Sequence, residues 1–463
     1  SRKICLPIGS AVTYLQLFRG GGKSNLSPKA FMAASAIAAS LAISPLTLAS
    51  ETIGQVTNTP SGSSYSGNLI IDSGDNAAIH GTNQNISIKT TANISENGDI
   101  TMNVGNAHGI LAELNEGNSI EINAAGTVTI HPVGSDSGDD GDGINVTADN
   151  NGSLYFTAGV SNIIYANSQN GDGIYIDVGS SGDLTLVANG SKESGNIIES
   201  ENNGIDHRGS QTISLNAANG INSIKAQTGD GLRLEGVGTI VLYGYDNKVT
   251  AGDNGIQVSQ GQIQLDASNN NFIKGALAGI QIDDKGTVSV SAVNTNEIRG
   301  GQYGVNVSNK SNSLSKLNIV GKQNNITVSG DNGKTIAGIS AYGNTDVNIE
   351  GNTHIVTSTD SAQSTAVYGV KLGNTDEFKG GNVYFKNGSV NIEASTTNGN
   401  VAGLDLRQKS LLDAQYNISD FKVVATHSGN GGQVSGAYVI GGSTLNINAL
   451  GDVQIIAQDS DIN

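Results

Sequence analysis

Residues 255–278 read GIQVSQGQIQLDASNNNFIKGALA, and residues 279–303 continue with GIQIDDKGTVSVSAVNTNEIRGGQY. Both segments open on a glycine and contain three short runs in which apolar and polar residues alternate. In the first segment these runs occupy residues 256–258, 263–265 and 272–273. A period of two is typical of β-strands that bury one face. The two segments therefore predict a unit of three short strands with no helix between them.

The same unit recurs along most of the chain at spacings of 24 to 34 residues. It starts at Ala78, Gly109, Gly143, Gly173, Gly204, Gly231, Gly255, Gly279, Gly304, Gly338, Gly369, Gly403 and Gly436. Such a period is typical of solenoids, and the missing 3.6-residue pattern excludes helix-bearing repeats. An antiparallel sandwich is the weaker alternative. The fixed strand order favours an all-β parallel β-helix of about 13 turns, with equivalent strands about 4.8 Å apart along a rod roughly 60 Å long.

The register predicts which side chains face the core. One inward column contains Ile256, Ile280 and Val305, and a second column, two residues later, ends at Val439. The glycine before the first column is expected to adopt positive φ at a tight corner. Asparagines recur before the third run, and their stacked amides are expected to form a structural ladder. The predicted ladder contains Asn162, Asn196, Asn222, Asn247, Asn271, Asn296 and Asn325.

Composition and charge narrow the class of protein further. The 463 residues include 63 Gly, 5 Pro and 1 Cys, which excludes collagen, coiled coils and disulfide-stapled domains. The 24 basic and 41 acidic residues give a formal net charge of -17. Nucleic-acid binding needs Lys and Arg to displace phosphate counterions. We therefore expect no nucleic-acid partner.

The amino-terminal segment has the pattern of an export signal. Lys23 and Lys29 precede an apolar run over residues 30–43, and small residues follow at Thr47 and Ala49. The run is shorter than the roughly 20 residues that span a membrane. The sequence predicts a signal peptide with an extended amino-terminal region over residues 1–49, cut after Ala49. A linker or amino-terminal cap would follow over residues 50–65, and the β-helix over residues 66–463.

The repeat pattern GDGIxIxxGxxxxLxxxxxN resembles the passenger regions of bacterial autotransporters and related surface adhesins. The resemblance covers nearly all of residues 66–463 and rests on a style of repeat, not on a diagnostic motif. It implies a right-handed parallel β-helix of the pectate-lyase-like architecture. It also implies display outside the cell by a carboxy-terminal outer-membrane β-barrel translocator. The chain stops at residue 463 inside an alternating run without such a barrel, so we expect its carboxy terminus to be truncated.

One acidic loop is a candidate metal site. Four carboxylates fall within residues 136–142, at Asp136, Asp139, Asp140 and Asp142. Calcium prefers oxygen-rich loops, but the spacing matches neither an EF-hand nor the glycine-rich calcium nonapeptide. A solvated acidic turn is the favoured interpretation. Asp142, Asp172 and Asp230, each in front of a column glycine, are expected to be ordinary turn residues.

Charged residues also gather on the outward face of three successive turns. They are Asp177, Asp206, Arg208, Arg233 and Glu235, with Tyr175 beside them and His207 in the inward column. Pectate-lyase-like enzymes carry carboxylates with Arg or Lys on such a face, where a carboxylate pair could cleave glycosidic bonds. The strict polygalacturonase motifs are missing. Pairing of mixed charges across strands is the competing explanation, and we expect His207 to be a satisfied histidine.

Two functions remain open at this stage. The favoured one is an exported adhesin or structural stalk on the cell surface, which contacts a receptor or glycan through many weak contacts along its polar face. The alternative is a secreted carbohydrate-active β-helix enzyme. A deep cleft with perturbed carboxylates at residues 177–235 would favour the enzyme, and a flat, charge-paired face would favour adhesion. We expect no cofactor.

Overall fold

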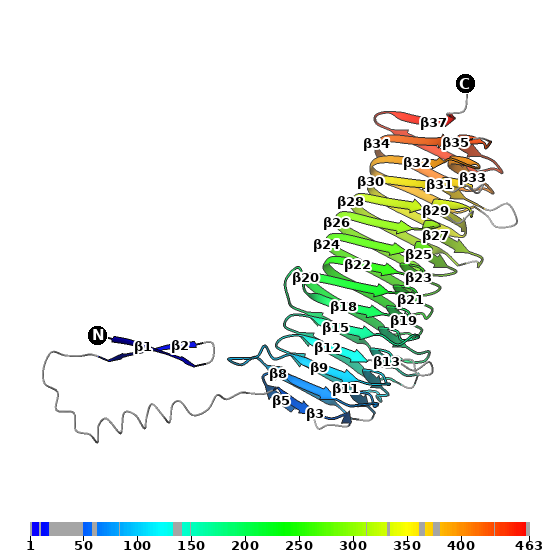
Figure 1. Ribbon diagram of the computed structural model, residues 1–463. Helices are drawn as coiled ribbons and strands as arrows, with labels where there is room; N and C mark the ends of the chain where they lie inside the picture. Colours follow the sequence, from blue (N-terminus) through cyan, green and yellow to red (C-terminus); the bar gives the residue numbers. More distant parts are fainter. Residues whose placement is uncertain are drawn as a thin grey trace, which may run out of the picture.

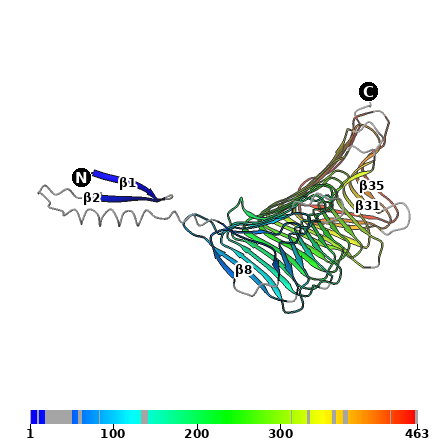
Figure 2. The ribbon, with the colours of Figure 1, turned by 60° about the horizontal axis from the view of Figure 1, so that its bottom comes forward.

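The computed structural model describes residues 2–8, 11–17, 50–57, 63–82, 84–132, 141–148, 150–311, 313–330, 334–360, 366–373, 380–429 and 431–459. All regular elements in these ranges are β-strands. From residue 51 onward they form two long sheets whose neighbouring strands are parallel and stack in chain order along a rod (Figures 1 and 2). The chain is therefore a right-handed parallel β-helix, as the repeat predicted.

The first sheet contains one short strand from each turn and has 14 strands. The repeat alignment predicted about 13 turns, and the additional turn precedes Ala78. The strands are β4 (Val56–Thr57), β7 (Ile79–Gly81), β10 (Ile110–Ala112), β13 (Ile144–Val146), β16 (Ile174–Ile176), β19 (Ile205–His207), β21 (Leu232–Leu234), β23 (Ile256–Val258), β25 (Ala278–Asp283), β27 (Tyr303–Asn309), β29 (Ile336–Gly343), β31 (Val367–Leu372), β33 (Val401–Leu406) and β35 (Val434–Val439).

The second sheet contains the remaining two strand positions of each turn. In the first turns and in the last one these positions are separate strands. They are β3 (Glu51–Ile53), β5 (Ser63–Ser66), β6 (Leu69–Asp72), β8 (Ile86–Thr91), β9 (Ile100–Val104), β11 (Ser119–Ala124), β12 (Val128–Pro132), β14 (Ser153–Ala158), β15 (Asn162–Ala166), β17 (Leu184–Ala188), β18 (Gly195–Ser200), β36 (Thr444–Ala449) and β37 (Val453–Asp459).

In the turns between these, the two positions merge into one long, bent strand. The merged strands are β20 (Thr212–Ala226), β22 (Thr239–Ala251), β24 (Gln262–Gly275), β26 (Thr287–Gly300), β28 (Ser315–Ser329), β30 (Thr345–Thr359), β32 (Asn382–Thr396) and β34 (Leu411–His427). The prediction of three separate strands thus holds for the first turns and the last one only. Most neighbouring merged strands shift register at the bend, as between Gly244 and Asp246. Backbone pairing resumes directly after this shift, so the ladder is interrupted only briefly.

The inward columns follow the predicted register. Ile256 pairs with Ile280, which pairs with Val305, and all three are fully buried. Val439 pairs with Leu406 as predicted but is 39% exposed, because it lies on the last turn. Burial of such branched side chains stabilises the fold by about 1.5–3 kcal/mol each.

The column glycines have a different role from the one predicted. Gly255 does not adopt the positive φ expected at its corner. A Cβ atom added there would lie 2.6 Å from the carbonyl oxygen of Gly279 and 2.7 Å from Cγ2 of Ile273. Glycine is therefore required because the backbone of the next turn and a side chain of β24, later in the same turn, crowd this position.

The asparagine ladder is present, with one correction. Nδ2 of each buried asparagine donates to Oδ1 of its equivalent one turn later, as in Asn247 to Asn271 at 2.9 Å and Asn271 to Asn296 at 2.9 Å. Asn296 donates to Asn324, not to the predicted Asn325. Asn325 is its outward neighbour, because the register shifts at the bend in this turn.

Strand pairing in the rod begins within residues 50–65. β3, β4 and β5 lie in the segment assigned to a linker or cap, yet they pair in parallel with β6, β7 and β8. The solenoid therefore begins at Glu51. Before it, β1 (Arg2–Ile8) and β2 (Ala11–Leu17) form a separate antiparallel pair. The predicted apolar run and cleavage site lie outside the described residues.

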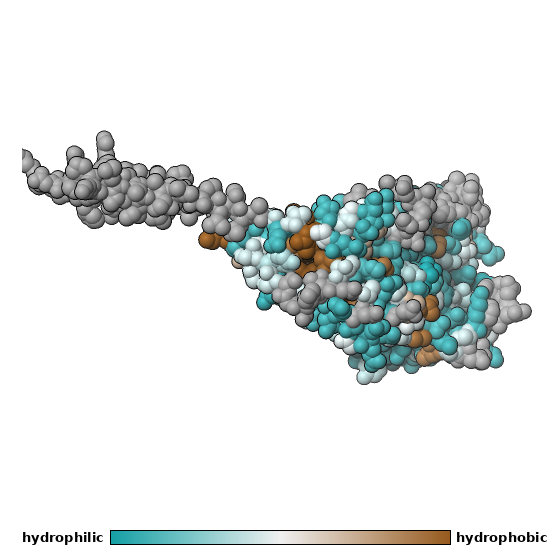
Figure 3. Space-filling model, turned by 90° about the horizontal axis from the view of Figure 1, so that it is seen from below, coloured by the Kyte–Doolittle hydropathy of each residue, from teal (hydrophilic) through white to brown (hydrophobic). Residues whose placement is uncertain are grey.

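The face of the molecule seen from below in Figure 1 is mainly polar. Figure 3 shows hydrophilic residues over most of the visible face, with hydrophobic residues in one patch near the amino-terminal end of the solenoid and at scattered points elsewhere. In the part of the chain that the structure describes, no helix has the length and hydropathy needed to cross a bilayer.

Candidate functional site

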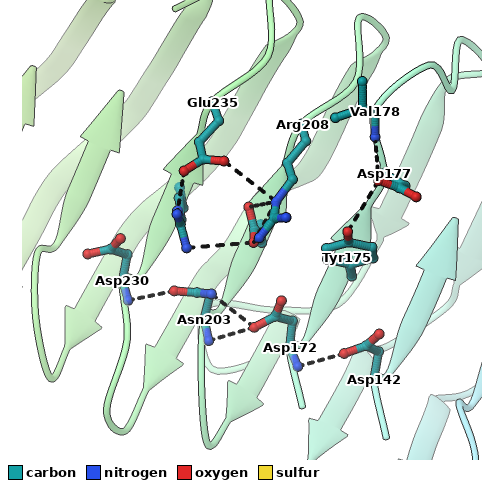
Figure 4. Close-up of polar contacts among 11 residues, drawn as sticks. Asp142, Asp172, Tyr175, Asp177, Val178, Asn203, Arg208, Asp230 and Glu235 are labelled. Carbon is teal, nitrogen blue, oxygen red and sulfur yellow. Dashed lines mark hydrogen bonds and ion pairs between the residues drawn. The ribbon is translucent and has the colours of Figure 1, made fainter. Parts of the chain in front are cut away.

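The predicted charged cluster forms on the outward face of the first sheet. Parallel pairing places Tyr175, Asp206 and Arg233 side by side on β16, β19 and β21. Arg208 and Glu235 follow two residues later on their turns, so they lie on the same face. Figure 4 shows Arg208 and Glu235 pointing toward one another across neighbouring turns, with Tyr175 on the preceding turn.

Asp206 is the buried centre of the cluster, not the solvated carboxylate expected from its outward position. Its exposure is 1%. Arg208 donates to its Oδ2 atom from Nη2 at 2.8 Å and from Nε at 3.2 Å. Burial raises the pKa of Asp206, and the hydrogen bonds from Arg208 oppose that shift. The long arginine side chains cover a strand face that the apolar–polar alternation alone predicts to be exposed to solvent.

The remaining charges close an ion-pair network around Asp206. Arg233 hydrogen-bonds Glu235 through Nη2, and its Nη1 atom lies 3.9 Å from Oδ2 of Asp206. Nε of Arg208 lies 3.6 Å from Oε2 of Glu235. Two carboxylates and two guanidinium groups thus alternate in one network.

Asp177 belongs to this cluster only through its neighbour. The hydroxyl of Tyr175 donates to Oδ1 of Asp177 at 3.3 Å, and the backbone N–H of Val178 donates to the same oxygen at 2.7 Å. The guanidinium carbon of Arg208 lies 5.2 Å from the centre of the Tyr175 ring, within cation–π range. Tyr175 therefore links Asp177 to the arginines.

The network limits what chemistry the cluster can perform. A glycosidase needs an accessible carboxylic acid that delivers a proton to the leaving oxygen. Asp206 has a raised pKa, but it is buried and hydrogen-bonded to Arg208. Glu235 is accessible, but it is paired with Arg233. This arrangement is typical of cross-strand charge pairing.

His207 is a satisfied core histidine. It is fully buried, its Nδ1 atom accepts the backbone N–H of Gly209 at 3.2 Å, and its Nε2 atom lies 2.8 Å from the carbonyl oxygen of Gln211. These contacts assign the hydrogen to Nε2. Burial lowers the pKa of His207, so the neutral ring is favoured.

A second polar feature is a buried ladder at the corner before the first sheet. Over successive turns from Asp142 to Asn254, a side-chain oxygen accepts the backbone N–H of the equivalent residue one turn later. Asp142 accepts from Asp172 at 2.8 Å, Asp172 from Asn203 at 2.8 Å, and Asn203 from Asp230 at 2.9 Å (Figure 4). Asp230 in turn accepts from Asn254 at 3.0 Å. The sequence interpretation as ordinary turn residues missed this ladder.

The ladder places two carboxylates close together in a buried corner. Asp142 is 2% exposed and Asp172 is 5% exposed. Burial, followed by the charge of Asp142, raises the pKa of Asp172 to about 8. Burial also raises the pKa of Asp230 to about 6.

Of the four carboxylates in the candidate calcium loop, one, Asp142, lies among the described residues. Asp136, Asp139 and Asp140 lie outside the described residues. Asp142 is buried instead of solvated, accepts from Nδ2 of Asn145 at 2.7 Å and lies 3.3 Å from Nδ1 of His108. Among the described side chains, no group of three or more His, Cys, Asp or Glu residues is arranged to hold a metal ion.

Sequence reasoning missed a similar charged cluster further along the first sheet. Nε of Arg407 donates to Oδ1 of Asp405 at 2.7 Å, and its guanidinium carbon lies 5.3 Å from the Tyr438 ring centre. Asp405 is 1% exposed, and Lys371 is its in-register neighbour. An Asp-x-Arg pattern after the column residue, shared by residues 206–208 and 405–407, is the signal that could have revealed it.

Comparisons with known proteins add no assignment: no family model, curated protein or solved structure matches this chain.

Proposed function

We propose that the chain is the exported passenger of a bacterial surface protein and acts as an adhesin or structural stalk. The observation that carries this proposal is the unbroken stack of 14 turns, whose outward charges on the first sheet pair with one another. A rod of this kind offers a long face for repeated weak contacts, and multivalency then replaces a single deep pocket.

Export to the cell surface is part of the same proposal. The basic, apolar and small-residue pattern before Ser50 supports a cleaved signal, and the repeat style supports an outer-membrane β-barrel translocator as export partner. The formal net charge of -17 suits an extracellular surface and opposes binding to nucleic acid. The receptor would be a protein or glycan on a host or neighbouring cell.

The experiment follows the chain on intact producing cells. Antibody labelling and removal by external protease should detect it outside the cell, with a mature amino terminus near Ser50. Cells that display it should attach to a host-cell layer more than cells without it. Retention of the chain inside the producing cell would contradict the proposal.

A matched variant separates adhesion from the enzyme alternative. Asp177→Asn with Glu235→Gln removes the two accessible carboxylates and leaves buried Asp206 unchanged. We expect display and attachment to persist, because no single pocket carries them. Release of sugar products from acidic or neutral polysaccharides by the unmodified chain, lost in this variant, would favour the carbohydrate-active enzyme instead.

A further inference from the structure

A groove follows the bend between the two halves of the merged strands. One part has a volume of about 440 Å³ and is lined by residues that include Asp246, Lys248, Phe272 and Glu297. Its lining comes from β20, β22, β24 and β26, which are consecutive turns. The groove therefore runs along the rod axis, on a different sheet from the charged cluster.

Two further hollows lie on the following turns, and neither shares a lining residue with the first. A second part, of about 420 Å³, is lined by residues from β26, β28, β30 and β32, among them Lys322, Glu350 and Asn387. A third part of about 260 Å³ shares Glu350 with it and adds Asn318 and Asn348. The residues that line the three hollows come from seven merged strands, from β20 to β32.

Amide side chains are the most frequent polar groups in this lining. An amide both donates and accepts hydrogen bonds. Nδ2 of Asn348 donates to Oδ1 of Asn318 at 3.3 Å, and Nδ2 of Asn387 donates to Oε1 of Glu350 at 2.8 Å. The groups are thus held in place while keeping further donor and acceptor positions. Sugar hydroxyls, which also donate and accept, match such a surface.

Charges in the groove are of both signs. The lining contains carboxylates at Asp246, Glu297 and Glu350 and ammonium groups at Lys248, Lys316, Lys322 and Lys386. Binding to a polyanion needs an excess of basic groups that displaces counterions. The near balance of charge favours an uncharged ligand over an anionic one.

The backbone of the groove is not available to a peptide strand. β22 pairs with β20 on one side and with β24 on the other, and the following merged strands are likewise paired on both sides. Recognition of a peptide by strand addition needs an exposed sheet edge. A ligand here must therefore be bound by side chains.

Phe272 provides a half-buried aromatic surface in the first part of the groove. The guanidinium carbon of Arg299 lies 5.5 Å from the ring centre, and Nε of Arg299 donates to Glu297 at 2.6 Å. Phe272 pairs in register with Lys248 on the preceding turn, and the Lys248 side chain is exposed. An aromatic ring beside polar groups can pack against the C–H face of a pyranose while neighbouring donors bind its hydroxyls.

We propose that this groove binds an uncharged polysaccharide, which lies along the rod axis across several turns. The proposal deepens the adhesin function and rests on it for its biological role, although binding itself can be measured with purified chain. Phe272 supplies the stacking surface, and Lys248 and the asparagines supply hydrogen bonds. Asparagine and lysine side chains on successive turns give neighbouring sugar residues further hydrogen-bond partners, so affinity grows with polymer length.

The test is native affinity electrophoresis of the full chain in gels that contain dextran, laminarin, galactomannan, polygalacturonate or heparin. We expect at least one neutral polysaccharide to retard the chain, with little change when salt is raised. Phe272→Ala should weaken this retardation at least about fivefold, and Lys248→Met should weaken it to a smaller extent. Tyr155→Ala is the matched control, because Tyr155 is 44% exposed on β14, outside the groove lining. Circular dichroism should show that all three variants are folded.

The outcomes separate this inference from the proposed function. Three outcomes would each contradict binding of an uncharged polysaccharide in the groove. They are retardation by no neutral polysaccharide, equal loss of retardation in Phe272→Ala and Tyr155→Ala, and salt-sensitive binding to heparin alone. If cells attach equally well with Phe272→Ala on their surface, the adhesin proposal stands and the groove is not its receptor site. Retardation that depends on Phe272, by a chain that stays inside the producing cell, would support the groove and overturn surface adhesion.

Discussion

Oδ1 of Asp172 accepts the backbone N–H of Asn203, one turn further along the solenoid, at 2.8 Å. Nδ2 of Asn203 donates to the same oxygen at 3.1 Å. Position 172 thus continues the corner ladder with a carboxyl group where the next turn has an amide. The ladder needs only an acceptor oxygen at this position, so ionisation of Asp172 brings a charge into a buried corner without adding a required contact.

The first prediction concerns pH. The pKa of Asp172 is raised from 3.8 to about 8, so the folded chain holds a proton there that the unfolded chain releases. The contribution of protonated Asp172 to the free energy of unfolding is fully present below about pH 4 and is lost as the pH rises through about 8. Asp172→Asn keeps the acceptor and removes the charge. We expect it to stabilise the chain by about 1–3 kcal/mol at pH 9 and by little at pH 4.

Thermal unfolding of the unmodified and variant chains at pH 4, 6, 8 and 9 measures this effect. Asp183→Asn serves as control, because Asp183 is exposed. A gain from Asp172→Asn that is the same at every pH would contradict ionisation as its cause.

The second prediction tests the inward register within one strand. Ile256 is fully buried, whereas Gln257 faces outward beside Arg233 and Gln281. Ile256→Asp should destabilise the surrounding turns by several kcal/mol, because a buried charge without a partner is costly. Gln257→Asp should change stability by less than about 0.5–1 kcal/mol. Hydrogen exchange should show the first lesion as local opening, since turns contact only their neighbours; similar losses for both variants would mean the register is wrong.

The third prediction concerns the asparagine ladder. Asn247 accepts from Asn222 at 2.8 Å and donates to Asn271 at 2.9 Å, so Asn247→Ala leaves two buried amides each short of a partner. We expect a loss of about 2–4 kcal/mol. Asn162 starts the ladder and donates only to Asn196 within it, so Asn162→Ala should cost about half as much. Denaturant unfolding compares the two, and equal costs would show that the ladder contacts do not decide stability.

The fourth prediction concerns the buried ion pair. Arg208→Leu leaves Asp206 with Arg233 at 3.9 Å as its remaining cation, and should destabilise the chain by about 2–3 kcal/mol at pH 7. Adding Asp206→Asn should recover more than half of that loss, because the stranded charge is removed. Glu235→Gln, on a side chain that is 38% exposed, should cost less than about 1 kcal/mol. No recovery in the double variant would show that Arg208 acts through packing alone.

The sequence by itself determined the solenoid and its inward columns. Alternation has a period of two, and repetition of Gly255-Ile256 at Gly279-Ile280 fixes which residues pair, so burial of Ile256 and Ile280 followed from local pattern alone. The asparagine ladder was predicted from the same spacing. Its last member was misplaced at Asn325, because a register shift at the bend in β28 puts Asn324 inward, and such shifts have no alternation signal.

Only the tertiary structure decided the environment of the charged groups. The alternation of side chains along β19 places Asp206 on the outward face. Side chains from its own turn and from the next turn nevertheless bury it. The raised pKa of Asp172 likewise depends on Asp142, 30 residues earlier in the chain and one turn away in space. Strand alternation is set by each residue's own backbone, whereas desolvation and ion pairing are set by side chains that the winding of the solenoid brings together. That is why the core could be predicted residue by residue and the charged surface could not.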